Sequence, residues 1–188
     1  MHLPNPIISP PWIKRLNTER LILQPLGRED ITDIFRLHQY AEVIAFNNLT
    51  APKDIQSTLD LLRPILDQYR HPGQHFAWTI RTPIDGAFRG AIGLNMRPQE
   101  PLIGELYYEI EPPFWGHGLA TESVHRVLSF AFEELNLRRV KALTATQNIR
   151  SIRVLEKVGM KKEGFRRVIL PERDIWQDTF EYSIDALL

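Results

Sequence analysis

Residues 105–122 read Glu-Leu-Tyr-Tyr-Glu-Ile-Glu-Pro-Pro-Phe-Trp-Gly-His-Gly-Leu-Ala-Thr-Glu, and the rest of the predicted fold is arranged around them. The first part alternates as in a strand, so one face carries Leu106, Tyr108 and Ile110 and the other carries Glu105, Tyr107 and Glu109. The strand ends at Pro112-Pro113, and a turn with two glycines leads into a helical pattern. Because free amides and the helix dipole favour an anion at a helix N-terminus, this stretch predicts a site for a phosphate-bearing ligand.

The composition is that of a single globular domain. The chain has 188 residues, of which 43% are hydrophobic and 24% are charged, and it is long enough to bury a core. The absence of cysteine excludes disulfides, thiolate metal sites and a cysteine nucleophile. No secretory signal pattern begins the chain, and no apolar run approaches the ~18 residues of a membrane span. We therefore expect a soluble, cytoplasmic protein with no membrane partner.

Charge is distributed unevenly along the chain. Lys and Arg number 23, as do Asp and Glu, so the net charge indicates neither a nucleic-acid nor a membrane ligand. Residues 138–167, however, contain ten Lys or Arg and two Asp or Glu, a net charge of +8. A basic segment beside a predicted phosphate loop favours a polyanionic ligand. A solvated basic face that binds nothing is the alternative.

The remaining pattern predicts one mixed α/β domain over residues 17–188, preceded by an extended, Pro-rich arm over residues 1–16 that Trp12 anchors. Apolar periodicity predicts strands at about 20–26, 75–80, 87–94, 105–110, 139–144, 162–169 and 175–184. It predicts helices at about 28–38, 52–66, 120–135 and 148–158. Pro64 should kink or divide the second helix, and residues 98–104 should form a loop. The last two strands should pair with each other.

Two common phosphate-binding loops are excluded by the sequence. No Gly-x-x-x-x-Gly-Lys-Ser/Thr motif is present, which excludes a P-loop NTPase. Gly116-His117-Gly118 lacks the third glycine of a dinucleotide-binding fingerprint. The turn instead combines the small residues Gly116, Gly118 and Ala120, which leave the backbone open to close approach by a ligand.

Trp115-Gly-His-Gly118-Leu-Ala120 resembles motif A of the GNAT superfamily of acyl-CoA-dependent N-acetyltransferases. That motif is Gln/Arg-x-x-Gly-x-Gly/Ala, and its amides hold the CoA pyrophosphate. Gly118 and Ala120 match it, while Trp115 stands at the Gln/Arg position. Further matches resemble the RimJ/RimL-like branch, which includes ribosomal-protein N-terminal acetyltransferases and enzymes that act on small amines. These matches are Thr18-Glu-Arg-Leu21, Ala120-Thr-Glu122, Asn148-x-x-Ser151 and Leu155-Glu-Lys-x-Gly159.

The resemblance implies a fold, a co-substrate and a set of site residues. The fold is a single GNAT domain with a mixed, mostly antiparallel sheet of about six or seven strands, splayed between residues 105–110 and 139–144 and flanked by about four helices. Acetyl-CoA is the implied co-substrate, with no metal, and residues 108–110 should pair with its pantetheine arm through their backbone. The implied cofactor-binding residues are Tyr108, Glu109, Ile110, Trp115, Gly116, His117, Gly118, Leu119, Ala120, Thr121, Asn148, Ser151 and Lys157.

Acyl transfer from a thioester to an amine needs a neutral amine, stabilisation of the carbonyl oxyanion and a proton for the thiolate. Glu105 and Glu109 are the candidate bases on one strand face, and the resemblance favours Glu105. Many GNAT enzymes carry a Tyr that protonates the thiolate seven residues after the matching Asn, but this chain has Leu155 there. Ser151 is the residue that the branch offers instead, with Asn148 in the same active site. The alternative for Asn148 is a helix cap without a chemical role.

We therefore expect an N-acetyltransferase that passes an acetyl group from acetyl-CoA to a primary amine by direct attack in a ternary complex. The acceptor is a protein N-terminus, an amino acid or a small amine, and residues 28–75 and the last hairpin form its wall. Two other classes stay open: a CoA-binding regulatory module without turnover, suggested by Leu155 and Trp115, and an RNA- or ribosome-surface protein that uses the charge of residues 138–167. Nucleic acid is not the expected partner, and the chain should be a monomer or a homodimer.

Overall fold

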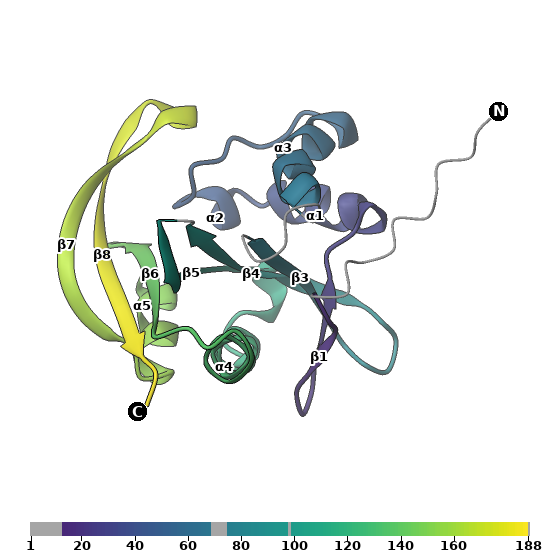
Figure 1. The fold of residues 1–188 in the computed structure, drawn as a ribbon. Helices are drawn as coiled ribbons and strands as arrows, with labels where there is room; N and C mark the ends of the chain where they lie inside the picture. The colour runs from purple at the N-terminus through teal and green to yellow at the C-terminus, as the bar shows by residue number, and fades with distance from the viewer. Residues whose placement is uncertain (1–12, 69–74, 98, 188) are drawn as a thin grey trace.

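The computed structural model describes residues 13–68, 75–97 and 99–187, and within them the strands form one sheet. Its eight strands lie in the order β1-β2-β3-β4-β5-β6-β8-β7. Their bounds are β1 Leu16–Asn17, β2 Ile22–Pro25, β3 His75–Arg81, β4 Phe88–Arg97, β5 Glu100–Ile110, β6 Arg139–Ala145, β7 Lys161–Leu170 and β8 Ile175–Asp185. The helices are α1 Ile31–His38, α2 Ala41–Ile44, α3 Ile55–Gln68, α4 Leu119–Ser129 and α5 Ile149–Lys157. Figure 1 shows α1, α2 and α3 over one face of the sheet and α4 over the other.

The predicted fold class is confirmed, with local differences in the elements. The predicted loop over residues 98–104 is wrong, because β5 begins at Glu100 and pairs with the end of β4. Pro64 lies inside α3 and does not divide it. Helix α2 was not predicted, and α4 continues after its last residue, Ser129, as a short π-helix over Phe130–Glu134. No helix in the described part of the chain is long and apolar enough to cross a membrane.

The predicted N-terminal arm lies only partly within the described residues. Residues 1–12, with Trp12, fall outside them. Ile13 and Leu16 are buried in the core, and Leu16 starts strand β1. Residues 13–16 are therefore part of the packed domain.

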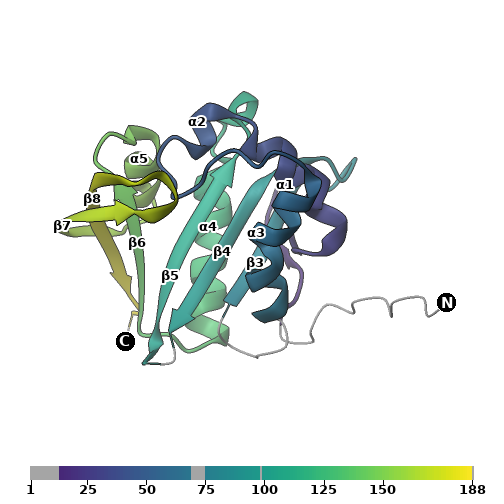
Figure 2. The same cartoon turned by 90° about the horizontal axis from the view of Figure 1, so that it is seen from above.

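The sheet opens between β5 and β6. All other neighbouring strands pair in antiparallel fashion, whereas β5 and β6 are parallel and pair only over Ile103–Glu105 and Arg139–Lys141. Beyond these three positions the two strands diverge, as Figure 2 shows. The opening lies beside residues 106–110 of β5, which confirms the splay that the resemblance implied.

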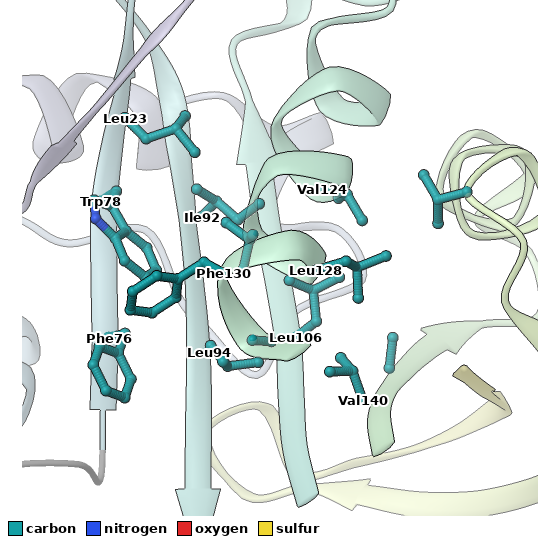
Figure 3. Packing of buried hydrophobic residues seen from close by; sticks show 14 of the residues in the cluster. Leu23, Phe76, Trp78, Ile92, Leu94, Leu106, Val124, Leu128, Phe130 and Val140 are labelled. Carbon is teal, nitrogen blue, oxygen red and sulfur yellow. The ribbon is translucent and has the colours of Figure 1, made fainter. Parts of the chain in front are cut away.

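Apolar clusters pack against both faces of the sheet. Under α4, the ring of Phe130 lies 5.5 Å edge-on from the rings of both Phe76 and Trp78, in the cluster drawn in Figure 3. The Trp78 indole N–H donates to the Lys14 carbonyl at 2.9 Å, so its one polar atom is satisfied. A second cluster on the other face packs Ile34 of α1 and other apolar residues against β3 and β4. Leu106 and Ile110 of β5 belong to the first cluster, and β5 pairs with β4 along one edge, so its side chains are presented on a rigid element.

Candidate functional site

The turn after β5 exposes the start of α4. Gly116 and Gly118 have φ angles of 82° and 80°, in the left-handed region that favours glycine. Gly118 is the N-cap of α4 and provides no side-chain cap, and the first helical hydrogen bond runs from the Glu122 amide to the Gly118 carbonyl at 3.0 Å. The amides of Leu119, Ala120 and Thr121 therefore precede the intrahelical ladder. This end of the helix can accept an anion.

An ion pair braces the turn from behind. The Arg20 guanidinium donates to the Glu122 carboxylate at 2.7 Å and to the His117 carbonyl at 3.2 Å, and the Arg20 amide donates to the same carboxylate at 2.9 Å. The Thr18 hydroxyl donates to it as well. Burial alone would raise the pKa of Glu122, but the hydrogen bonds from Thr18 and Arg20 and the charge of Arg20 outweigh it and lower that pKa. The Thr18-Glu-Arg20 and Thr121-Glu122 motifs are thus two halves of one contact.

A cavity of about 620 Å³, here called the outer cavity, runs from this turn along β5 to α5. Every predicted cofactor-binding residue except His117 lines it. The His117 side chain is exposed, and only its carbonyl takes part in the turn. Three cations of the basic segment, Arg150, Arg153 and Lys157, line the same cavity. The guanidinium of Arg150 lies 4.5 Å from the centre of the Trp115 ring.

Other cations of the basic segment are occupied elsewhere. Arg139 pairs with Asp185 at 2.6 Å, and Arg166 pairs with Glu181 at 2.5 Å, both on the C-terminal strands. The +8 segment therefore includes both ion-paired side chains on the sheet and a cationic group at the outer cavity. That group and the open helix start give this cavity the character of a polyanion site.

A second cavity of about 550 Å³, the inner cavity, adjoins the outer cavity along β5. Glu105, Tyr107 and Glu109, which alternation places on one strand face, line it together with Leu106 and Tyr108. The Tyr107 hydroxyl and His75 Nε2 are 2.7 Å apart, and burial lowers the pKa of His75 to about 4, so this imidazole is neutral at pH 7. Within the described residues, no group of three or more His, Cys, Asp or Glu side chains is placed to hold a metal ion.

The two cavities share six residues, which we call the junction. They are Phe46, Asn47, Tyr108, Glu109, Asn148 and Ser151. Of the three predicted catalytic residues, Asn148 and Ser151 lie at the junction, while Glu105 lines the inner cavity alone. A ligand in the outer cavity and a ligand in the inner cavity would come into contact at the junction.

Tyr108 and Ser151 form a hydrogen-bonded pair across the opening of the sheet. The Tyr108 hydroxyl lies 2.9 Å from Ser151 Oγ and 3.3 Å from the Ser151 carbonyl. Burial raises the pKa of Tyr108 to about 12, and the hydrogen bond with Ser151 offsets only part of that rise. Asn148 is the N-cap of α5, and its side-chain oxygen accepts from the Ser151 amide at 3.2 Å. Asn148 therefore caps α5 and, through this hydrogen bond, fixes the position of the Ser151 backbone.

Glu109 is held at the junction from two sides. Its carboxylate lies 2.9 Å from Nε2 of His38 on α1, and it accepts a hydrogen bond from the Asn47 side chain. His38 is buried, and its Nδ1 has no hydrogen-bond partner among the described residues. Sequence reasoning missed His38, Asn47 and the Tyr108 hydroxyl as site groups. Only the spatial contact reveals them, because no local pattern links α1 or the following loop to β5.

Residues 20–161 match the family model described as "Acetyltransferase (GNAT) domain". The uncharacterized N-acetyltransferase YoaA of Bacillus subtilis (strain 168) is 31% identical over 169 residues, which cover 90% of this chain and 95% of YoaA. Mycobacterium smegmatis RimJ in complex with CoA-disulfide matches with a TM-score of 0.82 and 21% identity over 95% of this chain and 90% of that one. Spermidine N-acetyltransferase from Vibrio cholerae in complex with CoA and spermine matches with a TM-score of 0.75 and 19% identity over 88% and 95%.

The two structural likenesses establish the shared fold, and the match of the family model and of YoaA over most of the chain establishes the family. The chain therefore belongs to the GNAT acetyltransferase family, and it is an acyltransferase that uses acetyl-CoA as co-substrate to acetylate an amine.

Proposed function

We propose that this chain is an N-acetyltransferase of the RimJ/RimL-like kind, in which a primary amine attacks acetyl-CoA directly at the junction. The observation that carries the proposal is the junction itself, where a cationic cavity and an acidic cavity share six residues. The outer cavity has the groups to bind a polyanionic cofactor, and the inner cavity has carboxylates for an ammonium group. Placing both reactants at one point converts their encounter into an intramolecular step.

The open turn supports the placement of the CoA pyrophosphate. The amides from Gly116 to Thr121 would donate to it, with Arg150 and Lys157 supplying charge nearby. Glycine at positions 116 and 118 leaves that backbone bare, and an added Cβ at Gly116 would meet no atom within 4 Å. The pantetheine arm would follow residues 108–110 through the opening between β5 and β6, where β4 pairs with one edge of β5 and the described part of β6 does not pair with the other.

A glutamate of β5 is the proposed base. The resemblance favours Glu105, which lines the inner cavity, whereas Glu109 lines both cavities and so lies nearer the meeting point. Glu109 accepts hydrogen bonds from His38 and Asn47, yet a carboxylate has about four lone-pair sites and keeps room for an amine or a water. The two residues therefore need a direct comparison.

The comparison uses Glu105→Gln and Glu109→Gln, with kcat/KM for the amine measured against pH. Removal of the base should lower kcat/KM by roughly 10²–10⁴-fold and abolish the acidic limb of the profile. Removal of a carboxylate that only binds the amine should raise KM and keep that limb. If both variants keep the limb and the wild-type kcat, the base lies elsewhere.

The inner cavity favours an acceptor without a carboxylate of its own. Its described lining residues include Glu105 and Glu109 but no Lys or Arg, so a free amino acid would find two like charges and no cationic partner. Spermidine N-acetyltransferase, to which this chain is similar in fold, is named for a polyamine, and the RimJ/RimL-like branch that the sequence resembles includes ribosomal-protein N-terminal acetyltransferases. We propose a small cationic amine or a protein N-terminus as the acceptor.

An acceptor screen tests the function. CoA release is measured with polyamines and monoamines, with peptides that begin with Ala or Ser, and with free amino acids. We expect turnover with the first two groups and little with the third. Preference for free amino acids would contradict the acceptor assignment. Thermal stabilisation by acetyl-CoA without CoA release for any amine would instead identify a regulatory module without turnover, the alternative that Leu155 suggests.

A further inference from the structure

The thiolate that leaves in acyl transfer needs a proton, and α5 provides no phenol for it. Leu155 occupies the expected position and is 1% exposed within the main apolar cluster. Ser151 is the only hydroxyl of the α5 segment that lines the junction among the described residues. A serine hydroxyl by itself is a very weak acid. Ser151 can therefore protonate the thiolate only if a second group supplies a proton to its own oxygen.

Strand β5 brings a phenol to the same place from the opposite side of the opening. Tyr108 lies on the strand face opposite Glu105 and Glu109, packs against the main cluster, and lines both cavities. Its hydroxyl reaches Ser151 Oγ at 2.9 Å, a good O–H···O distance. The capping bond from the Ser151 amide to Asn148 fixes the serine backbone, so the distance between the two hydroxyls is preset.

On the basis of the function proposed above, we propose that Tyr108 and Ser151 act as one proton-donating pair for the CoA thiolate, replacing the phenol that is absent at position 155. As the C–S bond breaks, its electron pair goes to sulfur, and the Ser151 proton follows to that sulfur. The phenolic proton of Tyr108 moves to Ser151 Oγ at the same time. The proton that the amine releases on forming the amide returns to the phenolate through the base and solvent, so the protons balance.

The environment of Tyr108 keeps its phenol protonated. Its pKa of about 12 keeps the phenol protonated throughout the neutral range, so the donor is loaded before each turnover. The other polar side chains of the junction are Asn47, Asn148 and Glu109, and the carboxylate of Glu109 already accepts hydrogen bonds from its neighbours. Within the described residues, the Tyr108–Ser151 pair is therefore the one hydroxyl donor at this place.

The test compares Tyr108→Phe, Ser151→Ala and the double variant with the wild type. Because Phe keeps the ring and its packing, the change removes only the hydroxyl. We expect each single variant to lower kcat by roughly 10²-fold, within the usual range for a lost general acid, with the Kd for acetyl-CoA unchanged within twofold. Residues that act as a unit are non-additive, so the double variant should be no slower than the slower single variant.

Tyr182→Phe is the matched control. The Tyr182 hydroxyl lies 3.3 Å from a Glu156 carboxylate oxygen, the residue is buried, and it lines neither cavity. Removal of this buried hydroxyl in Tyr182→Phe should leave kcat unchanged. A wild-type kcat in Tyr108→Phe, or fully additive losses in the double variant, would overturn the pairing.

A change of leaving group distinguishes a chemical role of the Tyr108 hydroxyl from a structural role. In an acetyl-CoA analogue with selenium in place of sulfur, the selenolate is a much weaker base and departs without a proton. Tyr108→Phe should therefore lose far less rate with the selenoester than with acetyl-CoA. Equal losses with both esters would show that the hydroxyl only shapes the site and would overturn the proposal. Absence of turnover by the wild type with every amine would overturn the proposed function and the pair together.

Discussion

Gly86 and Gly118 have similar backbones but very different surroundings. Their φ angles are 66° and 80°, both in the left-handed region, where a residue with a Cβ costs roughly 1–2 kcal/mol. Gly86 lies in the turn between β3 and β4, where an added Cβ would meet nothing within 4 Å. Gly118 caps α4 at the proposed pyrophosphate site. The pair therefore separates backbone strain from loss of a ligand contact.

Gly118→Asp should weaken acetyl-CoA binding at least about 100-fold, or ~2.7 kcal/mol, because a carboxylate would stand beside the pyrophosphate. Titration calorimetry measures the affinity. Gly86→Asp carries the same backbone cost and should bind acetyl-CoA normally. Normal binding by Gly118→Asp would refute the loop assignment, and an equal loss in Gly86→Asp would attribute the effect to general destabilisation.

The ionisation of Glu122 makes the free energy of unfolding depend on pH. Its lowered pKa means that the folded state holds the ionised carboxylate more tightly than the unfolded state, whose value is about 4.5. The stabilisation is present above that value and is lost as the pH falls through the folded pKa. Glu122→Gln should lower the free energy of unfolding by about 1 kcal/mol at pH 7. The difference from wild type should shrink below pH 4.5, because the unfolded wild-type chain takes up a proton at Glu122 at a higher pH than the folded one.

Urea unfolding at pH 7 and at pH 3.5 measures this difference. Glu19→Gln changes an exposed neighbour and should leave the free energy of unfolding unaltered at both pH values. A constant gap between wild type and Glu122→Gln at the two pH values would show that the ion pair with Arg20 does not cause it.

At the scale of elements, the turn between β7 and β8 holds the loop that follows α2. The Arg173 guanidinium donates to the Ala45 carbonyl at 2.6 Å, and the Gln177 side chain donates to the Phe46 carbonyl at 3.1 Å. The Glu172 amide donates to the Asn48 side chain at 3.0 Å. The loop supplies Phe46 and Asn47 to the junction, so the C-terminal hairpin positions one wall of the site.

Arg173→Ala should loosen this loop. We expect KM for the amine to rise several-fold and amide hydrogen exchange over residues 44–48 to accelerate, because three carbonyl contacts lose their donor. Arg167→Ala removes an exposed arginine of the same hairpin, 3.7 Å from Asp178, and should change neither quantity. Unchanged amide hydrogen exchange over residues 44–48 in Arg173→Ala would refute the proposal that Arg173 holds this loop.

Local patterns in the sequence were sufficient for most of the elements and for part of the site. The alternation in β5 correctly separates Glu109, which meets His38 of α1, from Tyr108, which meets Ser151 of α5. The small residues of the turn predict an open helix start, and both patterns depend only on neighbouring residues. Helix α2 has four residues, too few for a period to be visible. The partners of Tyr108 and Glu109 lie 43 and 71 residues away, so their pairing depends on how whole elements pack.

Over the whole molecule, the β5–β6 seam divides the sheet into two parts. Three paired positions join them, and the outer cavity is lined by β5 and α4 on one side and by α5 on the other. A cofactor in that cavity would therefore contact both parts. Binding to the native state alone adds stability in proportion to the logarithm of ligand concentration.

Acetyl-CoA at about 100 times its Kd should add ~2.7 kcal/mol and raise the Tm by roughly 5–10 °C. Scanning calorimetry gives the shift, and hydrogen exchange should show protection in both β5 and α5. Pantetheine at the same concentration lacks the pyrophosphate and should have a much smaller effect. Protection confined to one side of the seam would contradict a bridging position.

The brace behind the turn has a consequence for folding kinetics. The Arg20 amide and the Glu122 carboxylate that it contacts are 102 residues apart, so the contact closes a long loop. Contacts of high sequence separation form slowly, because the entropy of loop closure is lost before they stabilise the chain. During refolding, α4 would acquire its helical hydrogen bonds well before Thr18 and Arg20 dock behind it. Affinity for CoA is therefore a late property of the folding chain, gained only after its helix content is native.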